Sequence, residues 1–282
     1  MLRKINSVCI CGAGTMGRGI AEVFASGGFS TILYDVNEEI LLTAGNKISD
    51  NLRKLVSKNK ISEEEKANIY KYLRFTTQIK DCKSDLIIEA IIEDLPAKVS
   101  LFNDLKKINP GALFASNTSS LSIAAIAGEA QLEKSFIGLH FFNPAPLMKL
   151  VEIISTLHTS DELIDAAREL ITRLGKTGVV CKDAPGFIVN RVARPFYIES
   201  LRIAEEGPLT VDTIDNLLES RGFKMGPFKL MDLIGNDINY AVSNSLYNQL
   251  NKPGRLKPSP LQEEKVSSGH LGKKTGRGFY TY

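Results

Sequence analysis

The chain has 282 residues, a length typical of about two domains. Its 43% apolar and 24% charged residues exclude wholesale disorder and a low-complexity fibre. The net charge of +3, with no long basic block, argues against a dedicated nucleic-acid binder. This net charge does not exclude a local basic patch that binds a phosphorylated ligand.

The chain shows neither a membrane nor a metal signature. No apolar run reaches roughly 18 residues, so we expect no membrane span, and no N-terminal signal pattern is present. The four cysteines form no C-x-x-C pair and no cluster with histidine, so we expect neither a metal site nor a disulfide framework. Cys9 and Cys11, two apart in an apolar run, are typical of buried residues in a reduced, cytoplasmic protein.

The first half of the chain alternates strand and helix patterns. Short apolar runs predict strands over residues 5–11, 30–34, 85–88, 113–116 and 136–139. Helical periodicity predicts helices over residues 16–26, 38–58 and 96–107, and a further one from the Ser62-Glu-Glu-Glu box. Strand, helix and strand at this rhythm indicate an α/β fold with a parallel sheet and crossover helices.

The second half has a different character. After Asp183-Ala-Pro-Gly186 the strand signals fade, and helices are predicted over residues 187–206, 211–220, 230–250 and 259–267, with Pro195 as a kink. We therefore expect an α/β domain over residues 1–184, followed by an all-α C-terminal domain over residues 185–282. A helical unit of this small size often gains stability by dimerising, which is our hypothesis here.

A glycine motif gives the strongest local signal. Gly12-Ala-Gly14-Thr-Met-Gly17 follows a predicted strand and opens a predicted helix, which is the context of a dinucleotide-binding loop. Gly12 permits the tight turn, Gly14 lets the backbone approach a pyrophosphate, and Gly17 lets the helix pack on the sheet. The alternative is a glycine turn without a ligand.

An acidic residue completes this motif. Asp35 ends the second predicted strand, 18 residues after Gly17, where a carboxylate accepts hydrogen bonds from adenosine ribose hydroxyls and repels a 2′-phosphate. Glu38 and Glu39 add negative charge, so the pattern favours NAD over NADP. Asp35 is equally placed to cap the helix that follows, and both roles are compatible.

Polar residues follow two further predicted strands. Ser116-Asn-Thr-Ser-Ser-Leu121 and His140-Phe-Phe-Asn-Pro144 both lie at carboxyl ends of strands, where open α/β sheets bind ligands. Glu152 lies in an apolar run 12 residues after His140, and a buried carboxylate needs a partner. A glutamate that orients the imidazole lets the histidine take and return a proton near neutral pH. A core histidine bonded to backbone is the alternative.

The remaining polar candidates carry weaker signals. Asn190, early in the first helix after the boundary, is placed to reach across an interdomain cleft, or is a solvated side chain. His158 and His270 are typical of surface residues. By composition, the basic stretch from Arg53 to Lys60 is a solvated helix face.

Seven segments in order, spread over the whole chain, together resemble the short-chain L-3-hydroxyacyl-CoA dehydrogenase family, and the 3-hydroxybutyryl-CoA dehydrogenases in particular. They are Gly12-Ala-Gly-Thr-Met-Gly17, Ala115-Ser-Asn-Thr-Ser-Ser120, Gly138-Leu-His-Phe-Phe-Asn-Pro144, Met148-Lys-Leu-Val-Glu152, Pro185-Gly-Phe-Ile-Val-Asn-Arg191, Met225-Gly-Pro-Phe228 and Lys274-Thr-Gly-Arg-Gly-Phe-Tyr280. The resemblance implies a Rossmann-type NAD-binding domain, a helical domain that forms a homodimer, and NAD-dependent interconversion of (S)-3-hydroxyacyl-CoA and 3-ketoacyl-CoA.

The resemblance also assigns residue roles. It implies that His140 is the general acid and base, that Glu152 pairs with it, and that Ser119 and Asn190 hold the reacting substrate. It places the cofactor against the glycine loop and its neighbours Gly12, Gly14, Thr15, Met16, Gly17, Asp35, Glu93, Lys98 and Asn117. It implies substrate contacts at Asn143 and coenzyme A contacts at Lys58, Arg53 and Lys54.

Three alternatives remain open at this point. A β-hydroxyacid dehydrogenase acting on a free acid is disfavoured by the His140 and Glu152 pair. The same chemistry on longer-chain or dicarboxylic substrates, such as 3-hydroxyadipyl-CoA, fits the same residues. A non-catalytic NAD-binding protein is disfavoured by the intact set of Ser119, His140, Glu152 and Asn190.

Overall fold

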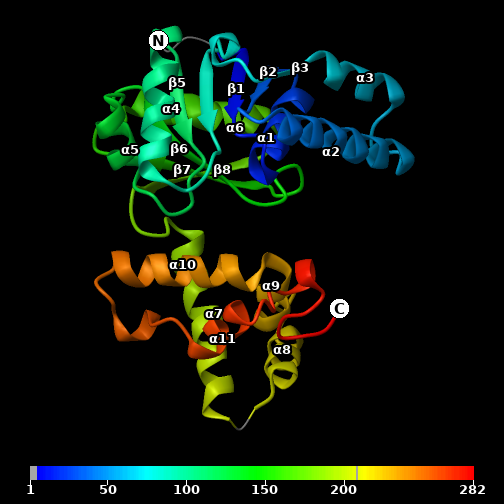
Figure 1. Cartoon of the computed structure of the whole chain (residues 1–282), viewed down its shortest axis with the longest axis vertical. Helices are drawn as coiled ribbons and strands as arrows, with labels where there is room; N and C mark the ends of the chain where they lie inside the picture. The colour runs from blue at the N-terminus through cyan, green and yellow to red at the C-terminus, as the bar shows by residue number, and fades with distance from the viewer. Residues whose placement is uncertain (1–4, 208) are drawn as a thin grey trace. The chain divides into compact units, whose positions relative to one another are not determined.

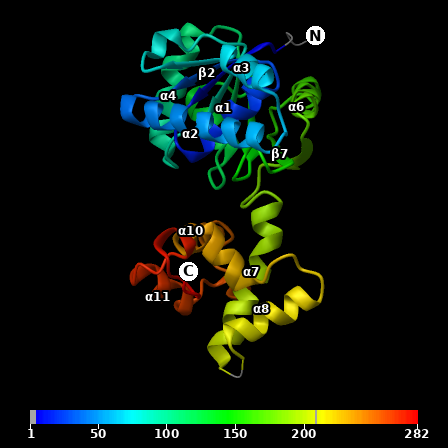
Figure 2. The same cartoon turned by 90° about the vertical axis from the view of Figure 1, so that its right-hand side faces the viewer.

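The computed structural model describes residues 5–207 and 209–282. The chain divides into two compact units, Met1–Ala184 and Pro185–Tyr282 (Figure 1 and Figure 2). The first unit holds every strand of the sheet, and the second is built from helices. The expected fold class, an α/β domain followed by an all-α domain, is confirmed.

The first unit is built on a sheet of eight strands within the described residues, in the order β3-β2-β1-β4-β5-β6-β7-β8. The pairing is parallel throughout, except between β6 and β7. The strands are β1 Ser7–Cys11, β2 Ser30–Tyr34, β3 Leu73–Thr76, β4 Leu86–Glu89, β5 Leu113–Ser116, β6 Phe136–Phe141, β7 Leu150–Ser155 and β8 Thr177–Lys182. Residues 142–149 between β6 and β7 are too few for a crossover helix, so the chain turns back antiparallel.

Helices cover both faces of this sheet (Figure 1). On one face, apolar side chains of α1, α2 and α6 form a core with alternate residues of β1, β4 and β6. On the other face, Phe102 of α4 packs edge-on against Phe114 and Phe136 of the sheet. The helices are α1 Thr15–Ser26, α2 Glu38–Ser57, α3 Glu63–Lys71, α4 Leu95–Ile108, α5 Ile123–Ala130 and α6 Asp161–Arg173, with a short 3₁₀ turn over Ile79–Asp81.

Most helices of the first unit begin at a side-chain cap. The side chain of Asn37 accepts from two backbone N–H groups at the start of α2, and Ser62 with Glu65 forms a capping box at α3. Asp94, Ser122 and Ser160 cap the later helices in the same way. Helix α1 differs, because its N-cap residue Gly14 provides no side-chain cap.

The second unit packs five α-helices around a small apolar core within its described residues. Phe228 and Met231 lie at the centre, fully buried, with Tyr197, Leu201 and Ile214 around them. The helices are α7 Val189–Glu206, α8 Val211–Ser220, α9 Pro227–Ile234, α10 Asn236–Gln249 and α11 Pro260–Ser267, with 3₁₀ turns over Gly254–Leu256 and Lys273–Thr275.

One predicted helix is wrong. The single helix expected over residues 230–250 is two helices, α9 and α10, which meet at Gly235. Gly235 has a φ of +107°, a backbone conformation that breaks an α-helix and that glycine adopts at little cost. Pro195, by contrast, lies inside α7 without ending it.

Two buried aspartates hold the C-terminal segment against the helices. Asp232 accepts hydrogen bonds from the backbone N–H groups of Phe279 and Tyr280, each at 2.9 Å. Asp215 accepts from the Tyr280 hydroxyl at 2.7 Å and from the N–H of Phe228 at 2.9 Å. The segments Met225–Phe228 and Lys274–Tyr280 therefore have a structural role, because residues of both bind these two carboxylates.

The four cysteines are free thiols, and Cys9, Cys11 and Cys82 are buried. None of the described helices is both long and apolar enough to cross a membrane. Strands β3, β7 and β8 and helices α5 and α6 had no residue range predicted from the sequence. Strand β3 lies at the edge of the sheet with Arg74 and Phe75 exposed, so its apolar pattern is weak.

Candidate active site

Five parallel strands, β2, β1, β4, β5 and β6, end at one edge of the sheet, and the predicted site residues of the first unit gather in the loops that follow them. Gly12 follows β1, Asp35 follows β2, and Glu93 follows β4. Ser119 follows β5, and His140 is the last residue but one of β6. The topology thus brings together residues as far apart in the chain as Gly12 and His140, at the position where such sheets bind ligands.

The glycine loop between β1 and α1 leaves no space for side chains at two of its positions. Gly12 has a φ of +101°, and a Cβ there would lie 2.5 Å from the carbonyl oxygen of Ala90. A Cβ on Gly17 would lie 1.7 Å from the carbonyl oxygen of Gly12. A Cβ on Gly14 would meet no atom within 4 Å. Gly14 therefore borders open space, into which the first turn of α1 points its N–H groups.

These N–H groups suit a phosphate ligand. The first turn of an α-helix has unpaired donors and a positive dipole end, and no side chain caps α1. Thr15 and Met16 occupy this turn, with Thr15 exposed. The carboxylate of Asp35 accepts from the N–H of Ala13 at 2.8 Å and fixes the loop beside the end of β2. Its remaining lone pairs can accept ribose hydroxyls, so these residues fit a dinucleotide.

His140 and Glu152 form a buried pair across β6 and β7. The two residues are direct partners in the antiparallel register, so their side chains leave the same face of the sheet. The distance from His140 Nδ1 to Glu152 Oε2 is 2.6 Å, and the two residues are 6% and 1% exposed. An Nδ1–H that donates to Glu152 leaves Nε2 as the proton acceptor. The imidazole also packs against the ring of Phe142, with the centroids 4.5 Å apart.

Glu93 organises the loop that carries Ser119. One carboxylate oxygen of Glu93 accepts from the Thr118 hydroxyl at 2.6 Å, from the N–H of Ser119 at 3.0 Å and from the Ser120 hydroxyl at 2.8 Å. Burial alone would raise the pKa of Glu93, but the nearby Lys98 ammonium and these hydrogen bonds lower its pKa overall. Glu93 is therefore an anion that ties the loop after β4 to the loop after β5.

Lys98 is buried rather than presented to a ligand. It is 1% exposed, and its ammonium lies 2.5 Å from Glu89 and 3.2 Å from Glu93. Glu89, at the end of β4, also accepts from the Ser116 hydroxyl at 2.6 Å, and burial raises its pKa. Glu89 was not among the predicted site residues. The sequence feature that could have identified Glu89 is its position as the one charged residue at the end of an otherwise apolar strand.

Asn117 follows β5, and Asn143 follows β6. The side-chain oxygen of Asn117 accepts from the N–H of Phe141 at 2.8 Å, which joins the end of β5 to β6. Asn143 is exposed in the loop of residues 142–149 and precedes a cis peptide bond to Pro144. The ammonium of Lys176, absent from the predicted site, donates to the carbonyl oxygens of Ala145 at 2.6 Å and Met148 at 2.7 Å. Lys176 therefore anchors this loop.

The other predicted residues lie away from this edge of the sheet or in the second unit. Arg53 and Lys54 are exposed in the last turns of α2, where Arg53 pairs with Asp50 at 2.5 Å. Lys58 is the exposed C-cap residue of the same helix. Asn190 is the second residue of α7 in the helical unit and is half-buried.

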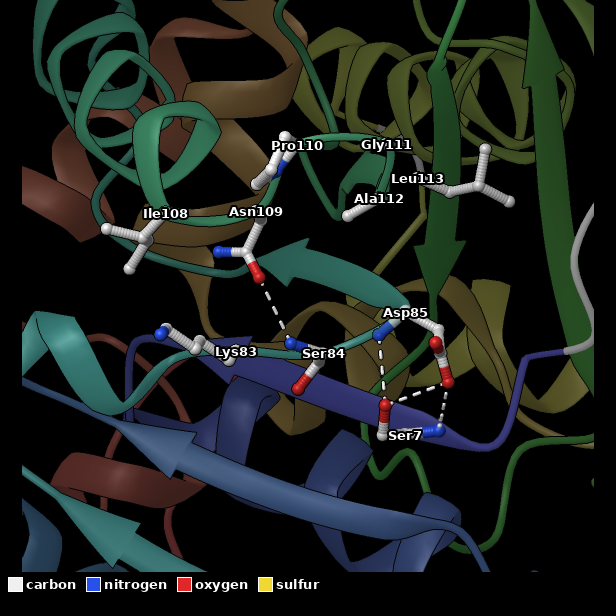
Figure 3. Close-up of a pocket in the computed structure, with 10 residues that line it drawn as sticks. All are labelled: Ser7, Lys83, Ser84, Asp85, Ile108, Asn109, Pro110, Gly111, Ala112 and Leu113. Atoms are coloured by element: carbon white, nitrogen blue, oxygen red, sulfur yellow. Dashed lines mark hydrogen bonds between the residues drawn. The ribbon is translucent and has the colours of Figure 1, made fainter.

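A pocket lies at the opposite ends of the strands, away from the predicted site residues. It lies where β1, β4 and β5 begin (Figure 3). Several of its polar groups bind one another: Asp85 accepts from the N–H and hydroxyl of Ser7 at 3.0 and 2.8 Å, and Asn109 accepts from the N–H of Ser84 at 3.1 Å. These bonds join the strand starts.

Two family models match the chain. Residues 7–184 match "3-hydroxyacyl-CoA dehydrogenase, NAD binding domain", and residues 186–282 match "3-hydroxyacyl-CoA dehydrogenase, C-terminal domain". A 3-hydroxyadipyl-CoA dehydrogenase of Escherichia coli is 44% identical over 285 residues, which cover 100% of this chain and 60% of that protein. A 3-hydroxybutyryl-CoA dehydrogenase of Mycobacterium tuberculosis is 37% identical over 287 residues and 100% of both chains.

Solved structures agree with the sequence matches. The crystal structure of (S)-3-hydroxybutyryl-CoA dehydrogenase from Ralstonia eutropha superposes with a TM-score of 0.94, at 37% identity, over 99% of both chains. The chain spans 60% of the length of its Escherichia coli relative, so that protein contains a further part. The predicted resemblance, the NAD cofactor and the dehydrogenase class are confirmed by these matches. The chain belongs to the 3-hydroxyacyl-CoA dehydrogenase family.

Proposed function

We propose that this chain interconverts (S)-3-hydroxyacyl-CoA and 3-ketoacyl-CoA, with a short acyl chain as substrate. The observation that carries the proposal is the buried pair of His140 and Glu152 at the carboxyl edge of the sheet, next to the dinucleotide loop. A dehydrogenase for a secondary alcohol needs such a base, because removing a hydroxyl proton near pH 7 is otherwise costly.

Bound NAD would supply the acceptor for the hydride that leaves C3 of the substrate. In the oxidation, Nε2 of His140 takes the proton of the 3-hydroxyl group while the carboxylate of Glu152 holds the Nδ1–H. The negative charge of Glu152 stabilises the imidazolium that forms. In the reduction, His140 returns the same proton to the C3 oxygen.

Further residues hold the substrate in this proposal. Ser119 and Asn190 donate hydrogen bonds to the substrate oxygens where negative charge develops. Asn143 contacts the substrate, and Lys58 meets the phosphates or the adenine part of coenzyme A, with Arg53 and Lys54 beside it. The exposure of these three cations on α2 supports a role in binding an anionic ligand.

We also propose that two chains associate through the helical unit. Several large apolar side chains of this unit are exposed, among them Leu217 at 57%, Leu233 at 51% and Phe223 at 50%. Apolar side chains that gather in one exposed patch are typical of an interface. The four free thiols support a reducing compartment such as the cytoplasm.

The test is NADH oxidation followed by absorbance, with acetoacetyl-CoA as substrate and with NADPH and free acetoacetate as controls. The proposal predicts fast turnover with NADH and acetoacetyl-CoA and slow turnover in both controls. Turnover of free acetoacetate at the same rate would replace the acyl-CoA assignment with a free-acid one. Binding of NADH without turnover of any acyl-CoA would identify a non-catalytic NAD-binding protein.

A further inference from the structure

Strand β4 ends in a buried carboxylate, Glu89, which has no role in the reaction proposed above. Glu89 is 0% exposed, and β4 lies between β1, which leads into the glycine loop, and β5, which leads to Ser119. Glu89 pairs with Ser116 of β5, and Ser116 pairs with Gly138 of β6. His140 follows Gly138 by two positions on β6. The side chains of Glu89 and His140 therefore leave the same face of the sheet.

Glu89 binds the loop after β5 directly. One of its carboxylate oxygens accepts from the Ser116 hydroxyl at 2.6 Å, and its backbone oxygen accepts from the N–H of Asn117 at 2.8 Å. The side-chain oxygen of Asn117 accepts in turn from the N–H of Phe141, the residue that follows His140. A continuous chain of hydrogen bonds thus connects Glu89 with the strand that carries the histidine.

Glu89 binds the same loop a second time through a buried ammonium. Its other carboxylate oxygen lies 2.5 Å from Nζ of Lys98, and this ammonium lies 3.2 Å from one carboxylate oxygen of Glu93. The second oxygen of Glu93 accepts from residues 118–120. All of residues 116–120 are therefore held by one cluster of side chains, and the ion pair of Glu89 and Lys98 lies at its centre.

Stability alone does not require an ion pair at this position. Taking two charges out of water can cost more than their attraction returns, and apolar side chains of similar volume often stabilise such a position better. An apolar residue at position 89 would continue the apolar pattern of β4. It would provide no acceptor for Ser116 and no charge for Lys98. The carboxylate thus adds a fixed geometry, because each of its oxygens binds a different part of the cluster.

We propose that Glu89 is a positioning residue, which sets the place of Ser119 relative to His140. It acts through Ser116 and Lys98. This inference rests on the proposed function, in which Ser119 donates to a substrate oxygen while His140 moves the proton. Ser119 lies in a loop outside any helix or strand, so its place depends on the bonds that hold the loop. A misplacement of about 1 Å can lower a rate by about 100-fold.

The experiment is a double-mutant cycle in the reduction of acetoacetyl-CoA by NADH. Glu89→Gln keeps the shape of the side chain and removes its charge. We expect kcat to fall by about 10- to 100-fold, while NADH affinity stays within a few-fold of wild type. In a Ser119→Ala background, Glu89→Gln should change kcat by less than about threefold, because Glu89 acts through Ser119. The control Asp104→Asn removes an exposed ion pair of α4, the helix of Lys98, and should leave kcat unchanged.

A second variant decides the question if Glu89→Gln does not fold. Ser116→Ala removes only the direct hydrogen bond to the Glu89 carboxylate. It should lower kcat by about 3- to 10-fold, the effect of one hydrogen bond. This loss should also disappear in the Ser119→Ala background.

Other outcomes overturn the inference. An equal loss of kcat with and without Ser119 would show that Glu89 does not act through this residue. A loss of NADH affinity as large as the loss of kcat would show a general structural role. The wild-type kcat in a folded Glu89→Gln would exclude a positioning role and leave the proposed function intact. The wild-type kcat in Ser119→Ala, or a wild type that turns over no acyl-CoA, would refute the proposed function and this inference together.

Discussion

The glycines of the dinucleotide loop give a matched pair of substitutions at the residue scale. A Cβ at position 14 enters open space, whereas one at position 17 collides with the Gly12 carbonyl. We expect Gly14→Ala to keep the melting temperature of the wild type and to weaken NADH binding, because its methyl group occupies the space of the pyrophosphate. We expect Gly17→Ala to lower the melting temperature or to prevent folding, because of this collision. Calorimetry measures the melting temperature of each variant, and fluorescence titration measures its affinity for NADH. An unchanged NADH affinity in Gly14→Ala would contradict the cofactor assignment.

Glu93 makes stability depend on pH. Its pKa is lowered in the folded protein, so it stabilises the fold above its unfolded pKa of about 4.3. That contribution is lost as the pH falls through the folded pKa. Glu93→Gln should therefore be less stable than wild type at pH 7, and the difference should shrink toward pH 3. Urea unfolding measures it, with the exposed Glu129→Gln as control. A difference that stays constant with pH would exclude an ionic role for Glu93.

The pairing of His140 with Glu152 was easier to predict than the contacts of the residues around them. His140 and Glu152 lie in an apolar sequence context that makes each conspicuous, and the register of β6 and β7 then pairs them. Glu89 and Lys98 are 9 positions apart with nothing in the sequence to link them, yet they form one buried ion pair. Such pairs depend on where a loop folds back, which local pattern does not specify.

At the scale of elements, the loop of residues 142–149 depends on one buried ammonium. Lys176→Met would leave the carbonyl oxygens of Ala145 and Met148 without a donor, at a cost of about 1–3 kcal/mol for each unpaired acceptor. We expect a lower free energy of unfolding and a raised KM for the acyl-CoA, because the loop carries Asn143. Lys134→Met, at an exposed lysine outside this loop, is the control. Equal effects of the two substitutions would refute an anchoring role for Lys176.

The elements with strong periodicity were predicted to within a few residues. Strand β2, strand β5 and helix α8 have the predicted bounds. Two errors have a common physical cause. Gly235 takes a positive φ where α9 and α10 meet and pack on each other and on α7, and β3 pairs with the outer edge of β2. Both outcomes are decided by tertiary packing rather than by the local sequence.

For the whole molecule, the exposed apolar side chains of the helical unit predict a dimer. The double substitution Leu217→Asp and Leu233→Asp should convert it to a monomer, because two charges per chain would be buried in the interface. Light scattering coupled to size-exclusion chromatography measures the mass. Leu157→Asp, at an exposed apolar residue of the first unit, should leave the mass unchanged. A monomeric wild type, or a double variant that remains a dimer, would contradict this interface.

The most direct test of the account is the rate of NADH oxidation with acetoacetyl-CoA in wild type and His140→Ala, measured side by side. The buried pair with Glu152 predicts that kcat falls by roughly 10² or more, because the proton then has no positioned donor. NADH affinity should stay within a few-fold of wild type, since His140 is not part of the glycine loop. A variant that retains the wild-type kcat would show that His140 is not the acid and base of this reaction.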